Sequence, residues 1–178
     1  MIPARPRYAR IEQLAGALLR EAGVSDPPVP IDDIVRGQGI VIRLMDLKEN
    51  SGLVVRDGTR TVIGVNRAHA FTRRRFTVAH ELAHALLHEG KEVHYDKDFR
   101  VDFRSGTSSL GVDVVEMEAN FFAASILMPW RFREADSLVA GLDFENADAA
   151  IKTIAAHYKV SPHAMSIRLG NLSARSAR

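Results

Sequence analysis

Cysteine is absent from the 178 residues of the chain, which excludes disulfide bonds and metal sites built on thiolates. Any metal ion would have to be held by histidine, aspartate or glutamate. The absence of cysteine also fits a protein of a reducing compartment, and we expect a cytoplasmic location.

Long apolar runs are also missing, and none approaches the roughly 20 residues that a membrane helix needs. In residues 1–23 the apolar positions are interrupted by Arg10, Glu12, Arg20 and Glu21, which is not the pattern of a signal peptide. We therefore expect no membrane partner.

Neither sign of charge dominates, because 24 basic residues face 22 acidic ones. This balance gives no support to direct nucleic-acid binding. The composition, 46% hydrophobic and 26% charged, is typical of a soluble globular protein. We expect a single domain over residues 1–178, with its core in about 10–172 and a disordered tail at 173–178.

Residues 76–88 are the most informative stretch of the chain. Alanine and leucine dominate it without glycine or proline, which predicts a helix, with Thr72 as its cap and Gly90 at its end. Apolar side chains lie on nearly every face, so the helix should be buried. It nevertheless carries three histidines and a glutamate, which are costly to bury without a partner. A metal ion would resolve that conflict.

The spacing of the ionisable residues favours a metal site. His80 and His84 are one helical turn apart and leave the same face, as two ligands of zinc or another divalent ion would. Glu81 points about 100° around the helix, beside the metal, where its carboxylate can take a proton from the attacking water. This is the His-Glu-x-x-His arrangement of zinc proteases. The alternative is an ordinary helix with solvated histidines.

A second helix is predicted over residues 115–128, where Pro129 stops it. Two histidines leave zinc one protein ligand short, and Glu116 is our candidate for the third. Asn120 shares its face and can hydrogen-bond a ligand. Glu118 points about 200° around the helix from Glu116, and it remains an alternative ligand.

Three strand-like runs, at 40–46, 52–56 and 61–66, predict a small three-stranded antiparallel sheet with a tight turn at Asp57-Gly58. If the 61–66 strand is an edge, it could hold an extended peptide, with Ile63, Val65 and Asn66 as contacts. The alternative is a plain core strand.

Several further segments leave alternatives open. Residues 73–75 are three arginines at a helix start, where a solvated face is favoured over an anionic partner. The long connection 91–113 could flank the site, and its Tyr95 could touch substrate. Helices at 147–158 and 162–172 resemble a helix-turn-helix, although a packed hairpin is favoured. Candidate oxyanion donors are Tyr95, His157, Tyr158 and His163.

Residues 75–88, residues 116–124 and Leu127-Met128-Pro129 together resemble the ImmA/IrrE family of metallopeptidases. Val65-Asn66, Val160-Ser161 and Arg168-Leu169 are also similar, and the resemblance covers roughly residues 10–172. It implies an α+β fold, a helical, gluzincin-like (zincin-like) domain with a small three-stranded sheet. It also implies one zinc ion on His80, His84 and Glu116, and a catalytic Glu81. His88 matches the pattern too, but the drift of about 40° per four residues favours a capping role over metal binding.

The resemblance also implies a substrate, since members of this kind cleave helix-turn-helix (Xre-like) repressors in stress, phage or mobile-element responses. The alternative is a zinc-containing module without protease activity that binds a partner within a repressor or toxin–antitoxin pair. The intact Glu81 favours the protease, because only catalysis requires it.

Overall fold

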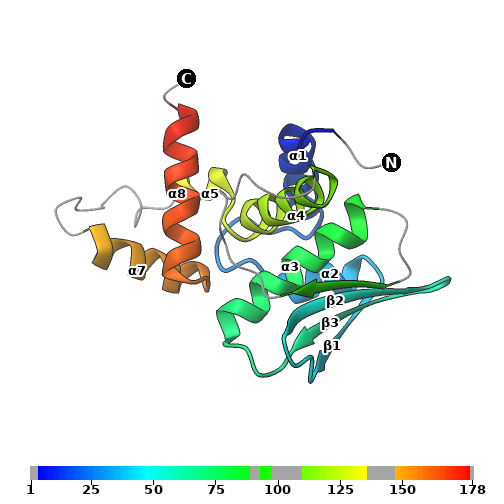
Figure 1. Ribbon diagram of the computed structural model, residues 1–178. Coiled ribbons are helices and arrows are strands. Elements are labelled where there is room, and N and C mark those ends of the chain that lie inside the picture. Colours follow the sequence, from blue (N-terminus) through cyan, green and yellow to red (C-terminus); the bar gives the residue numbers. More distant parts are fainter. Residues whose placement is uncertain (1–3, 89–92, 98–109, 136–146, 177–178) are drawn as a thin grey trace.

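The computed structural model describes residues 4–88, 93–97, 110–135 and 147–176. Its helices are α1 (Tyr8–Glu21), α2 (Ile31–Gly37), α3 (Phe71–Leu87), α4 (Leu110–Leu127), α5 (Trp130–Ala135), α7 (Ala147–Tyr158) and α8 (Pro162–Ser176). Its strands are β1 (Ile40–Met45), β2 (Asn50–Asp57), β3 (Arg60–Asn66) and β4 (Val93–Lys97). The predicted α+β class is therefore confirmed (Figure 1).

The sheet is mixed and has the order β1-β3-β2-β4, so the prediction of a purely antiparallel, three-stranded sheet is wrong. β2 and β3 form the expected hairpin, and Gly58 adopts φ 44° in its turn, a conformation that glycine tolerates. β1 pairs with β3 in parallel, because the chain crosses from β1 to β2 past the end of β3. β4 was missed, and it lies within the segment predicted as a long connection.

Asn66 holds that crossing in place. Its side-chain amide donates to the carbonyls of Lys48 (3.2 Å) and Asn50 (2.9 Å), and its Oδ1 accepts from the Ala68 amide (3.0 Å). β3 lies inside the sheet, and Ile63 and Val65 are fully buried. Of the two alternatives left open, the structure shows the core strand, so Ile63, Val65 and Asn66 do not form an edge to which a peptide strand could be added.

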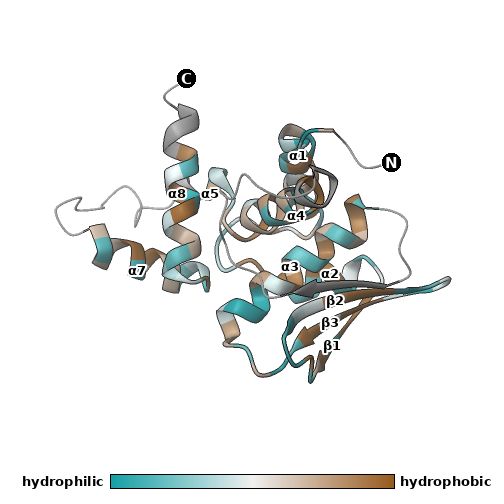
Figure 2. Ribbon diagram, in the orientation of Figure 1, coloured by the Kyte–Doolittle hydropathy of each residue, from teal (hydrophilic) through white to brown (hydrophobic). Residues whose placement is uncertain are grey.

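Helix α3 lies across one face of the sheet, and α4 crosses α3 on the side away from the sheet (Figure 1). α1 packs on α4, while α7 and α8 stand together at one side of the molecule. Apolar residues follow the strands and α4, whereas the tip of the β2–β3 hairpin is hydrophilic (Figure 2). The helix that carries the His-Glu-x-x-His sequence is thus enclosed between the sheet and α4.

Thr72 does not cap α3 as predicted. The N-cap is Ala70, which is extended (φ −56°, ψ 152°) and makes no side-chain capping bond, and Thr72 lies in the first turn. The three arginines that follow are not simply a solvated face. Arg75 is buried and donates to the carbonyls of Val29 (2.7 Å) and Lys159 (3.1 Å). Its partners are backbone carbonyls, and they tie α3 to two distant segments.

Arg75→Met is expected to lower the free energy of unfolding by about 2–3 kcal/mol, because it leaves two carbonyls without their charged donor. Urea denaturation measures the loss, and the neighbouring, partly exposed Arg74→Met is the matched control. Equal stability of the two variants would mean that these carbonyl contacts contribute nothing.

The C-terminal helices form the predicted packed hairpin, and Ser161 Oγ accepts from the Ala164 amide (3.1 Å) as the expected cap. α8 continues to Ser176, beyond the predicted helix end at residue 172. Tyr158 is 3% exposed and lines a small cavity with Met128, Met165 and others, at the end of α4 opposite Glu116. Met128, which lines the same cavity, follows Glu116 by about 18 Å along the helix, so this cavity lies far from Glu116. Within the described ranges, no helix has the length and apolar character needed to cross a membrane.

Candidate metal centre

Helices α3 and α4 bring His80, His84 and Glu116 together. The Nε2 atoms of the two histidines are 2.9 Å apart. Glu116 Oε2 is 3.2 Å from His80 Nε2, and its Oε1 is 3.5 Å from His84 Nε2. Both imidazoles are buried, whereas the Glu116 side chain is 31% exposed. The ligand set predicted from spacing is thus gathered in space, with one side open to solvent.

Asn120 orients the first histidine, as its position on the face of Glu116 predicted. Its Oδ1 lies 2.8 Å from His80 Nδ1. A carbonyl oxygen only accepts, so this contact places the proton on Nδ1 and leaves a lone pair on Nε2. The lone pair of His80 points toward the cluster.

The second histidine is oriented by a longer chain of contacts. His84 Nδ1 is 3.2 Å from His88 Nδ1, and His88 Nε2 is 3.0 Å from Glu118 Oε2. Arg7 binds the same carboxylate. Glu118 is therefore engaged away from the cluster, which leaves Glu116 as the better candidate for the third ligand.

The charge states of His88 and Glu118 follow from their surroundings. Burial lowers the pKa of His88 even though Glu118 opposes the shift, so the imidazole is neutral near pH 7. Burial alone would raise the pKa of Glu118, but hydrogen bonds from Arg7 and His88 outweigh it and bring the pKa to about 2. Glu118 is thus a permanent carboxylate that can only accept hydrogen bonds.

These contacts test whether a metal fits. With both Nδ1 atoms protonated, two Nε2 lone pairs and a carboxylate converge on one point without a hydrogen between them, an arrangement that only a cation stabilises. Ligand atoms of a tetrahedral zinc ion lie about 3.3 Å apart, as follows from zinc–ligand bonds of about 2.0–2.1 Å. The separations of 2.9, 3.2 and 3.5 Å fall on both sides of that value. The residues therefore fit a divalent metal.

Glu81, the predicted proton acceptor, is fully buried where α3 contacts β2. Gly52 of β2 makes this contact possible, because a Cβ at that position would lie 2.6 Å from Glu81 Oε1 and 2.5 Å from Thr77 Cγ2. No local sequence pattern indicates that this glycine contacts the site.

Gly52→Ala is expected to force β2 and α3 apart. Overpacking of this kind costs about 1–3 kcal/mol of stability, and displacement of the Glu81 carboxylate should lower hydrolysis by about a hundredfold. Thermal unfolding and turnover measure the two effects. The control is Gly170→Ala, where an added Cβ meets no atom within 4 Å. Wild-type turnover in Gly52→Ala would contradict this view of the contact.

His88 is the C-cap residue of α3, as predicted. Arg56 of β2 adds hydrogen bonds to the carbonyls of His84 (2.6 Å) and His88 (3.0 Å) at this helix end. Tyr95 belongs to the edge strand β4, opposite Leu53 in the pairing. His88 was visible in the sequence as a third histidine at four-residue spacing, but only a capping role was predicted for it, and its contacts with His84 and Glu118 were not.

The sequence matches the model of the Peptidase_M78 family, described as an IrrE N-terminal-like domain, over residues 35–170. The chain belongs to this family. The predicted ImmA/IrrE relationship is therefore confirmed, and Peptidase_M78 is a metallopeptidase family, consistent with the cluster above.

One similar solved structure is a Mycobacterium tuberculosis transcriptional regulator, with a TM-score of 0.56 and 18% sequence identity. The match covers 90% of this Peptidase_M78 chain but only 46% of the regulator, so the chain spans less than half of that protein. At this identity the likeness establishes the fold alone. No curated protein sequence matches the chain significantly.

Proposed function

We propose that this Peptidase_M78 member is a zinc-dependent endopeptidase of the cytoplasm. The observation that carries the proposal is the convergence of two Nε2 lone pairs and the Glu116 carboxylate, with buried Glu81 next to His80 in the same helix. A binding module would have no use for a carboxylate buried at that position, where its desolvation is costly.

When bound, zinc polarises the scissile carbonyl and makes water more acidic. The residues of the chain then have distinct tasks. His80, His84 and Glu116 hold the ion, and Asn120 fixes the ring of His80. Glu81 accepts the proton of the attacking water and passes it to the leaving amine. Tyr95, on the edge strand, remains our candidate for contacting substrate.

The proposed substrate is a transcriptional regulator, most specifically a helix-turn-helix repressor of the Xre type, whose cleavage relieves repression. The family relationship supports this choice, and so does the name of the similar solved protein. The nearly balanced charge of the chain gives no reason to expect direct binding to DNA.

The test is a comparison of new protein N-termini in cells that express either the wild-type chain or Glu81→Gln. Labelling of terminal amines followed by mass spectrometry should reveal a cut inside a helix-turn-helix protein that is specific to the wild type. Identical sets of N-termini, obtained under conditions that induce the natural response, would contradict the proposal.

A further inference from the structure

We infer that Arg7, which lies outside the family match, is a positioning residue of the metal centre that acts through Glu118 and His88 on His84. The inference rests on the proposed metal site and adds a residue of the N-terminal segment that affects it. Three observations support it.

The first link is a carboxylate fixed from several directions by one residue. Arg7 donates to Glu118 through its backbone amide (2.7 Å), its Nε (2.9 Å) and its Nη2 (2.6 Å). The Glu118 side chain is fully buried. Arg7 Nη2 also reaches the carbonyl of Leu87 (3.4 Å), so the same guanidinium contacts both α4 and the end of α3.

The second link is the direction of the hydrogen bonds. Glu118 accepts, so His88 donates from Nε2 and its Nδ1 becomes an acceptor. That Nδ1 accepts a hydrogen bond from the Nδ1–H of His84, so the lone pair of His84 lies on Nε2, the atom that faces the cluster. The Glu118 carboxylate, two hydrogen bonds away, therefore fixes the tautomer and the ring orientation of the metal ligand His84.

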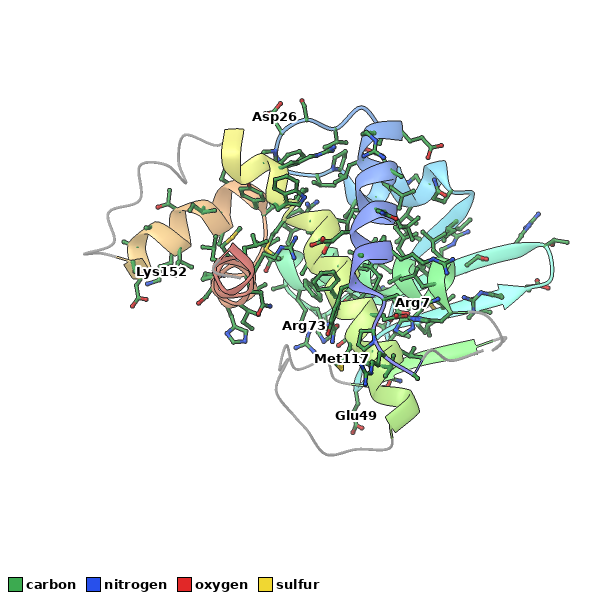
Figure 3. The ribbon with its side chains drawn as sticks, turned by 90° about the horizontal axis from the view of Figure 1, so that it is seen from above. Arg7, Asp26, Glu49, Arg73, Met117 and Lys152 are labelled. Carbon is green, nitrogen blue, oxygen red and sulfur yellow. The ribbon has the colours of Figure 1, made fainter. Side chains whose placement is uncertain are left out.

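The third link is the position of Arg7 in the fold. Arg7 is the residue before α1, and Figure 3 places it beside the part of α4 that carries Met117. The next residue, Tyr8, packs its ring on Phe121 of α4 (centroids 4.6 Å apart). The N-terminal segment thus docks on α4, and its position bears on the metal centre through Arg7, Glu118 and His88.

Removing Arg7 would leave a buried carboxylate without its main donor, and Glu118 would lose its fixed position. His84 would then keep its place in α3 but lose the orientation of its ring. Loss of such an outer partner typically lowers metal affinity by about 10–100-fold. The same loss is expected when the link is broken at His88.

The experiment measures zinc affinity of the full chain by competition with a chromophoric chelator, together with the visible spectrum of the cobalt(II)-loaded protein. The variants are Arg7→Met, His88→Leu and His88→Gln. The control is Arg10→Met, which removes an exposed arginine from the first turn of α1, close to Arg7 in the sequence. Thermal unfolding of the metal-free proteins is recorded in parallel, because a purely structural role would change only that temperature.

Arg7→Met and His88→Leu should bind zinc about 10–100-fold more weakly and alter the cobalt spectrum, while Arg10→Met matches the wild type. His88→Gln, which can still accept and donate, should recover much of the loss. If both Arg7→Met and His88→Leu bind zinc with wild-type affinity, the inference is overturned, while the proposed function stands. Should Arg7→Met fail to fold, the two His88 variants decide by the same criteria. A wild-type protein that binds no zinc would overturn the proposed function, and the inference with it.

Discussion

Replacement of Glu81 by glutamine is expected to abolish hydrolysis and leave metal binding intact. Glutamine has the same shape, so it fits the buried position against Gly52. Its amide cannot take a proton from water, and the loss of a general base typically costs about 10²–10⁴-fold in rate. The three ligands lie on other side chains, so zinc stoichiometry should stay at the wild-type value.

Two measurements check this result. The first is the zinc content by elemental analysis, and the second is the rate of cleavage of the helix-turn-helix protein identified by the comparison of N-termini. Glu49→Gln is the matched control, because Glu49 is exposed on the connection between β1 and β2. Loss of zinc in Glu81→Gln would show that Glu81 acts as a ligand. Wild-type cutting by this variant would remove it from the reaction.

His80→Ala is expected to have the second large effect, the loss of metal and activity together. His80 Nε2 lies 2.9 Å from His84 Nε2 and 3.2 Å from Glu116 Oε2, so it is one of three donor atoms that face the same point. Its removal leaves only two. Removing a ligand should weaken zinc binding by more than the roughly 10–100-fold that an outer partner contributes.

Zinc titration by calorimetry measures the effect of His80→Ala, and the exposed His163→Ala is the control for loss of an imidazole elsewhere. Retention of wild-type zinc affinity in His80→Ala would place the metal at a different site. Retention of activity without zinc would exclude metal-assisted hydrolysis by this cluster.

Much of the site was predictable because it depends on two helices with strong local patterns. His80, Glu81 and His84 share one helix, and their relative directions follow from helix geometry. Glu116 and Asn120 share the other, and the structure brings them to the same cluster. Only the packing of one helix on the other had to be assumed, and the small side chains of α4 favoured it.

The remaining features depend on contacts between distant parts of the chain. The parallel pairing of β1 with β3 arises from a crossing that Asn66 stabilises, and no local pattern shows it. Arg7 and Glu118 are 111 residues apart, so their ion pair has no sequence signature. Strand β4 is short and polar, and its pairing with β2, more than its own residues, defines it.

The most direct test of the central claim is a substrate-trapping experiment in the native cell. Glu81→Gln is used to capture partners, and the captured proteins are then incubated with the zinc-loaded wild type. Metal-dependent peptide hydrolysis predicts capture of an intact helix-turn-helix protein that the wild type cuts at one site, with cutting abolished by a chelator. A captured partner that the zinc-loaded wild type leaves intact would contradict the claim and identify the chain as a binding module.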